Sequence, residues 1–225
     1  MKAFVIGSLT ALLAASSLVQ GATISTSLGN TASLLVNGAN QTTTQVNAAQ
    51  TGQPAPFTGN CGSDGSANCS ANWSFSYTVP SGQIITGATL LLGIWDIDSG
   101  ASLNQVASYA LTGGDILTAL LNAAANAPNA GAGSKNSEYD ILSVTIPSTS
   151  FVELASGTAN IALALQGPGL GVGPTNPTFN GAKLVFSTLN IDTAEVTTTP
   201  EPSFFALVPM ALGAFAFFRR RRKSC

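Results

Sequence analysis

Histidine is absent from the 225-residue chain, and charged residues make up only 8% of it. Without an imidazole, the chain cannot form the Ser-His and Cys-His pairs of many hydrolases, and it lacks the commonest metal ligand. No Gly-x-Ser-x-Gly or Gly-x-Gly-x-x-Gly motif occurs. The sequence therefore gives no indication of the nucleophile elbow of a hydrolase or of a dinucleotide-binding site. These absences predict a protein that is not an enzyme.

Positive charge is scarce outside the C-terminal segment. Between residues 23 and 199, nine acidic residues face only Lys135 and Lys183, which gives a net charge of −7. Such a domain repels phosphate backbones and anionic lipid headgroups, so no nucleic-acid partner is expected. The interval of about 177 residues suits one domain with a core of its own.

The N-terminus has the pattern of an export signal. Lys2 precedes an apolar stretch at residues 3–19, and small residues follow at Gly21 and Ala22. This order predicts a secretory signal peptide over residues 1–22, cut after Gly21 or Ala22. A retained N-terminal anchor is the alternative, which the short, small-residue-rich segment disfavours.

The C-terminus has the pattern of a membrane segment. Residues 203–218 carry no charge, and five basic residues follow at 219–223. As a helix this run is about 24 Å long, a marginal span for a hydrocarbon core of roughly 30 Å. Basic residues next to a membrane helix keep that end of the helix in the cytoplasm. The pattern therefore predicts a transmembrane helix at 203–218 and a cytoplasmic tail at 219–225.

A proline-containing linker precedes this helix. Residues 197–202 read TTTPEP, and the two prolines favour extended, accessible backbone. The sorting residues are Pro200, Glu201 and Pro202, followed beyond the apolar run by Arg219, Arg220, Arg221 and Arg222. In order, spacing and position, residues 200–223 resemble the tripartite PEP-CTERM sorting signal of exopolysaccharide-producing Gram-negative bacteria.

The resemblance implies a route and a set of partners. It implies that exosortase, a membrane-embedded cysteine enzyme, cuts near the Pro-Glu-Pro after transient anchoring in the inner membrane. The protein then reaches the cell surface or extracellular matrix, where association with exopolysaccharide in a biofilm is implied. On this basis the chain is predicted to be a structural surface or matrix protein. The alternative is a permanent anchor that keeps its tail.

Cysteine placement agrees with export. Cys61 and Cys69 bracket the loop GSDGSAN, and an oxidising exterior favours a disulfide between them. Closing a ring of nine residues stabilises the fold by about 2.5 kcal/mol in the chain-entropy model. Two free thiols are the alternative, whereas two thiolates without histidine do not complete a zinc site.

The intervening domain reads as an all-β protein. Trp73, Phe75 and Tyr77 alternate with small polar residues, which is typical of a half-buried strand at 72–79. Further strands are expected at 24–28, 84–95 (one or two strands), 106–111, 139–146, 151–154, 159–165 and 183–191. A short helix is expected at 115–127. We therefore predict a jelly-roll-like antiparallel β-sandwich over residues 23–196, weakly structured at 23–59.

The candidate binding residues lie at a predicted strand end. Asp96 and Asp98 could offer oxygen ligands to calcium, the one cofactor considered, although an Asp-capped turn with solvated carboxylates is favoured. Trp73 shares a face with Phe75 and is expected in the core. Trp95 and the loop at 168–181, together with a calcium ion, would make a carbohydrate-binding module, the alternative to a purely structural role.

Overall fold

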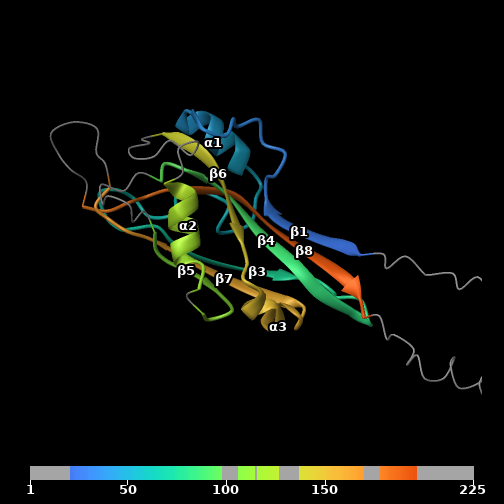
Figure 1. Ribbon diagram of the computed structural model, residues 1–225. Helices are drawn as coiled ribbons and strands as arrows, with labels where there is room; N and C mark the ends of the chain where they lie inside the picture. The colour runs from blue at the N-terminus through green and yellow to red at the C-terminus, as the bar shows by residue number, and fades with distance from the viewer. Residues whose placement is uncertain (1–20, 98–105, 115, 127–136, 170–177, 197–225) are drawn as a thin grey trace, which may run out of the picture. The chain divides into compact units, whose positions relative to one another are not determined.

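The computed structural model describes residues 21–97, 106–114, 116–126, 137–169 and 178–196 (Figure 1). Four predicted segments lie outside these ranges: the signal peptide up to residue 20, the linker at 197–202, the helix at 203–218 and the arginine cluster. Within them, no helix combines the length and apolar character needed to cross a membrane.

Two sheets of antiparallel strands make up the described domain (Figure 1). The five-stranded sheet has the order β1-β8-β4-β6-β2, and the three-stranded sheet has the order β3-β7-β5. The strands are β1 (Ala22–Gly29), β2 (Ala39–Asn40), β3 (Ser70–Ser76), β4 (Gln83–Trp95), β5 (Val106–Leu111), β6 (Glu138–Thr145), β7 (Thr158–Leu165) and β8 (Lys183–Glu195).

The core lies between the two sheets, because strands of both sheets send alternate apolar side chains into it. In β3 the residues alternate between exposed and buried, with Trp73 and Phe75 on the inner face. The same cluster holds Leu90, Leu92, Leu142, Val144, Leu189 and Ile191 from the larger sheet, with Tyr109, Leu111, Ile161 and Leu163 from the smaller one. The predicted all-β sandwich is confirmed at this level.

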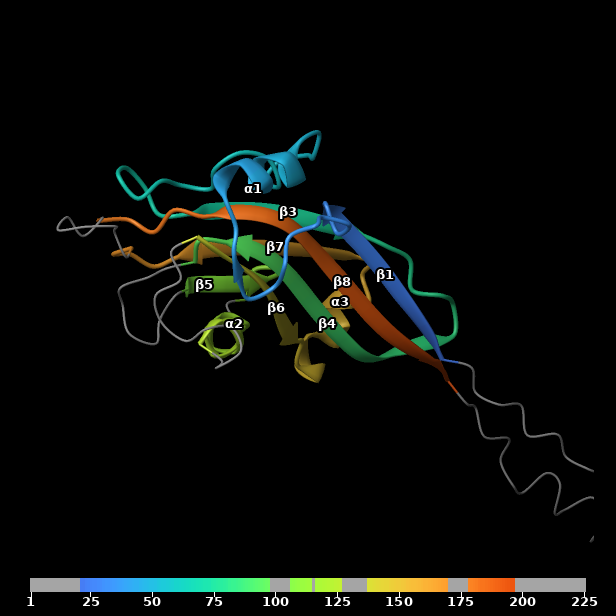
Figure 2. The same cartoon turned by 90° about the horizontal axis from the view of Figure 1, so that it is seen from above.

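The first strand pairs with the last. β1 and β8 run antiparallel from Ala22 opposite Thr193 to Gly29 opposite Phe186, and the Thr193 hydroxyl donates to the Ala22 carbonyl at 2.9 Å. Figure 2 shows the two strands side by side. The strand predicted at 24–28 is therefore confirmed. It extends from Ala22 to Gly29 and lies at one edge of the larger sheet.

One helix covers the outer face of the larger sheet. Helix α1 (Thr43–Gln50) begins at a capping box, in which the Thr42 side chain accepts from the Gln45 backbone and the Gln45 side chain accepts from the Thr42 backbone. Its buried Val46 joins a second apolar cluster beside the sheet. Sequence patterns did not predict this helix, because residues 23–59 show weak periodicity.

A second helix was predicted from the sequence and is confirmed. Helix α2 (Thr118–Ala125) lies within the predicted range of 115–127 and packs against β5 and β6. The hydroxyl of Thr118 accepts a hydrogen bond from the Tyr109 backbone at 2.7 Å, which ties the helix to β5.

The strand predicted at 151–154 is wrong. This segment forms the short helix α3 (Phe151–Leu154), entered through a 3-10 turn at Ser148–Ser150. Leu154 is buried whereas Val152 is 78% exposed, so the inward side chains follow helical spacing rather than strand alternation. Four residues are too few for a period to separate the two structures. The segment at 84–95 forms the single long strand β4.

Candidate functional site

A polar surface pocket of about 170 Å³ lies where three segments meet. These are the disulfide loop after Cys61, the end of β4, and the chain leading into β8. The lining includes Ser63, Asp64, Trp95, Asp96, Gly181 and Lys183. The pocket thus contains two carboxylates and one ammonium group.

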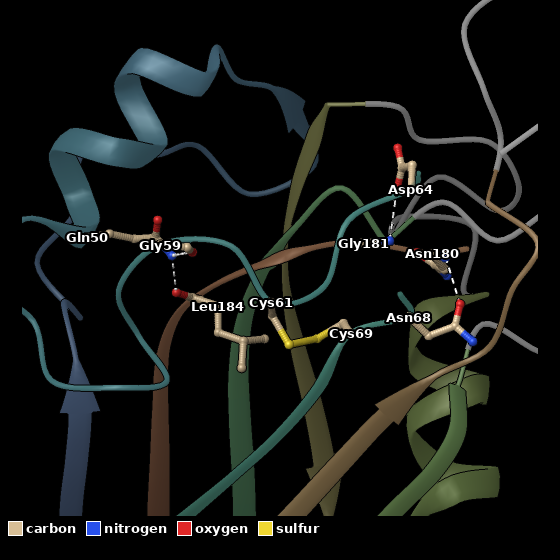
Figure 3. Close-up of a disulfide and its surroundings, with 9 residues drawn as sticks. All are labelled: Gln50, Gly59, Cys61, Asp64, Asn68, Cys69, Asn180, Gly181 and Leu184. Atoms are coloured by element: carbon tan, nitrogen blue, oxygen red, sulfur yellow. Dashed lines mark hydrogen bonds between the residues drawn. A yellow bond between two sulfur atoms is a disulfide. The ribbon is translucent and has the colours of Figure 1, made fainter. Parts of the chain in front are cut away.

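The disulfide predicted between Cys61 and Cys69 is confirmed, with their Cα atoms 4.6 Å apart (Figure 3). Both cysteines are buried. Backbone hydrogen bonds dock this ring onto the approach to β8: the Cys61 amide donates to the Ala182 carbonyl at 2.8 Å, and the Cys69 amide donates to the Asn180 carbonyl at 2.8 Å. The ring therefore forms a fixed wall of the pocket.

Asp64 fastens the tip of the ring. Its Oδ1 accepts from the Gly181 backbone amide at 2.8 Å, and Asn68 Oδ1 accepts from the Asn180 amide at 2.8 Å (Figure 3). A Cβ at position 181 would lie 2.8 Å from the Ser63 Cα, so this close approach requires glycine. Sequence reasoning missed Asp64, whose hydrogen-bond partner is 117 residues away.

Asp96 lies directly after β4 and has a left-handed backbone with φ of 68°. Its amide donates to the Glu138 carbonyl at 2.9 Å, and its Oδ1 accepts from the Ser137 amide at 2.6 Å. Burial raises the pKa of this carboxyl, the Ser137 hydrogen bond opposes the change, and the nearby charge of Asp64 raises the pKa further. The carboxylate therefore caps the entrance to β6, 41 residues further along the chain, and most of the turn predicted after Asp96 lies outside the described residues.

The two tryptophans are both buried. Trp73 is 6% exposed and packs edge-on against Phe57 with ring centroids 5.6 Å apart, which confirms the expected core position. Trp95 is 8% exposed, and its indole nitrogen donates to the carbonyls of Gln41 and Ser137. Trp95 thus contributes to the wall of the pocket, and its burial leaves little of the ring surface for a sugar to stack on.

Lys183 is the residue of this site that the sequence analysis did not single out. It is 7% exposed, and its side chain has no hydrogen bond or ion pair to any residue within the described ranges. Burial lowers the pKa of its ammonium group. The sequence feature that could have identified Lys183 is its rarity: it stands at the start of a predicted strand, and the domain has only one other basic residue.

The calcium hypothesis stays a prediction. Asp98 lies outside the described residues, as do residues 170–177 of the long loop. Across the described ranges, no group of three or more acidic or cysteine side chains is placed to hold a metal ion.

The chain matches no protein-family model and no curated protein.

Proposed function

We propose that the chain is an exported, non-enzymatic structural protein of the cell surface or extracellular matrix. The sorting tail, with Pro200, Glu201, Pro202 and Arg219 to Arg222, directs it through the inner membrane to exosortase. One observation carries the proposal: β1 begins at Ala22, where signal cleavage is expected, and β8 ends at Glu195, just before the linker. The described fold occupies the interval between the two export segments.

The chemistry of the domain supports an extracellular setting. The Cys61–Cys69 disulfide is of the kind that persists in oxidising compartments. The chain carries few charges, and its domain is acidic, which fits a matrix of neutral polymers better than a phosphate-rich partner. Exopolysaccharide is the matrix polymer that the resemblance of the tail implies, and jelly-roll connectivity stays part of the same proposal.

The tail is tested by the intact mass of the protein recovered from the surface fraction of an exosortase-bearing host. The same chain is expressed in a host without the enzyme, and a variant with alanine at Pro200, Glu201 and Pro202 serves as the matched control. We expect a C-terminus near Pro200 only for the unaltered chain with the enzyme present. A mass that includes Cys225 under every condition would instead establish a permanent membrane anchor.

A carbohydrate-binding module is the second candidate, and one observation favours it. Trp95, Asp96 and Gly181, which come from the strand end and the loop identified in the sequence, line the same pocket. Their meeting gives the candidate a site, although Trp95 does not serve as the stacking surface.

A further inference from the structure

The pocket is lined by a lysine side chain that has no protein partner in the described part of the chain. Lys183 is more than nine-tenths buried, lines the pocket, and forms no hydrogen bond or ion pair with a residue in the described part of the chain. The ammonium nitrogen is not among the buried side-chain atoms that lack a hydrogen-bond partner, so the stem is buried and the charged end is accessible from the pocket. An accessible ammonium group that no protein acceptor occupies can donate hydrogen bonds to a ligand, so Lys183 is a candidate ligand contact in this pocket.

Two carboxylates supply the opposite hydrogen-bonding character. Asp64 and Asp96 each use Oδ1 to accept from a backbone amide, of Gly181 and Ser137 respectively. These bonds fix both carboxylates in place and leave each Oδ2 available to a ligand donor. Lys183 forms no ion pair with either aspartate, so the ammonium group and the carboxylates are separate features of the lining.

This combination selects for an uncharged ligand. Lys183 would attract an anion that Asp64 and Asp96 repel, and the two carboxylates would attract a metal cation that Lys183 repels, so neither kind of ion matches the whole lining. A neutral molecule with several hydroxyl groups meets neither penalty, because each hydroxyl both donates and accepts hydrogen bonds. The volume of about 170 Å³ lies below the roughly 300–1,000 Å³ of drug-sized sites, which indicates a molecule with a single ring.

We propose that this pocket binds one uncharged, hydroxyl-rich ring of the sugar class. Asp64 and Asp96 accept hydrogen bonds from its hydroxyls, and Lys183 donates to it. Calcium takes no part. The proposal deepens the carbohydrate-binding candidate and is independent of the sorting tail.

The test is calorimetric titration of the full chain, purified in detergent, with glucose, galactose, mannose and N-acetylglucosamine, each with and without a chelator. The variants are Lys183→Met, which keeps the aliphatic stem, and Asp64→Asn, which keeps the acceptor for Gly181. Asp192→Asn is the matched control: Asp192 is exposed and lies on the same strand about 30 Å from Lys183. Far-UV circular dichroism and thermal unfolding verify that every variant is folded.

We expect saturable, chelator-insensitive binding of at least one sugar. Binding should weaken at least tenfold in Lys183→Met and in Asp64→Asn and be unchanged in Asp192→Asn. Lys183→Met should also unfold at the same or a higher temperature, whereas a purely structural lysine would leave a less stable protein when replaced. These combined results would support the proposal.

Three outcomes would overturn the proposal. One is folded wild-type protein that binds none of the four sugars, and another is binding that both pocket variants retain. The third is binding that disappears with the chelator, which would assign the site to calcium. Because the assay does not involve exosortase, each of these results would leave the sorting proposal intact.

Discussion

At the scale of single residues, burial acts on the two signs of charge in opposite directions. It lowers the pKa of the Lys183 ammonium group and raises the pKa of the Asp96 carboxyl. Both pKa shifts are toward the neutral form, because taking a charge out of water is unfavourable. The lining of the pocket therefore shields both signs of charge partly from water.

Asp96 should make the stability of the fold depend on pH. The unfolded carboxyl titrates near its ordinary pKa of 3.8, whereas folding raises that pKa. Between the two values the folded state keeps a proton that the unfolded chain has lost, so the free energy of unfolding falls as pH rises through this window. Asp96→Asn removes the titration and can still accept from Ser137. Its stability relative to wild type should rise with pH above 3.8 and then level off.

Urea unfolding of both proteins at a series of pH values measures this difference. Asp192→Asn controls for the loss of one exposed carboxylate. Parallel profiles for wild type and Asp96→Asn would show that folding does not perturb the Asp96 carboxyl.

At Gly93, two aromatic side chains pack directly against the backbone of β4. A Cβ at this position would lie 2.6 Å from a ring carbon of Phe186 and 2.6 Å from the Tyr139 hydroxyl. Because both residues are buried, neither ring has free space to move into, and Gly93→Ala should lower the free energy of unfolding by about 1–3 kcal/mol.

The matched control is Gly87→Ala on the same strand. Its Cβ would meet only side-chain atoms of the exposed Asp192, the nearest being Oδ2 at 3.2 Å, so stability should change by less than about 0.5 kcal/mol. Chemical denaturation compares the two variants. An equal decrease in the free energy of unfolding for both would show that the rings around Gly93 move aside without destabilising the fold.

At the scale of elements, the disulfide ring links stability to the pocket. Replacing Cys61 and Cys69 by serine should lower the free energy of unfolding by about 2.5 kcal/mol, the value for a nine-residue ring. It should also weaken sugar binding, because Ser63 and Asp64 lie within the ring. Denaturation of both proteins with and without reductant tests this, and reductant should affect only wild type. An unchanged midpoint would mean that the backbone bonds to 180–182 hold the loop unaided.

The elements differ in how far the sequence predicts them. Strand β3 was predictable because one of its faces is apolar and the other polar, so the alternation is visible. Helix α1 was not, because it buries only Val46, Ala49 and Gln50, too few for a clear periodicity. The Thr42 and Gln45 capping box was its only local signal. Helix α3 was mistaken for a strand because its period cannot be read from four residues.

At the scale of the whole molecule, the site depends on contacts between distant parts of the chain. Sequence reasoning identified Asp96 and Trp95 because both lie at a visible strand end. It could not add Asp64 or Lys183, because the bond from Gly181 to Asp64 joins residues 117 positions apart. It also could not show that Trp95 is buried, since its indole donates to carbonyls at positions 41 and 137. Local patterns predicted the strands, and the pairing of the strands created the site.

The position of strand β8 determines how the domain would respond to a pulling force. Lys183 of the pocket opens this strand, and Glu195, shortly before the proposed sorting tail in the sequence, closes it. A pull between a bound polymer and an anchored C-terminus would therefore run along β8 itself. This strand lies between β1 and β4, and its ladder bonds are perpendicular to the pull, so they must shear together rather than open one at a time. If both proposals hold, the domain thus places an interior strand of its larger sheet in line with the tension.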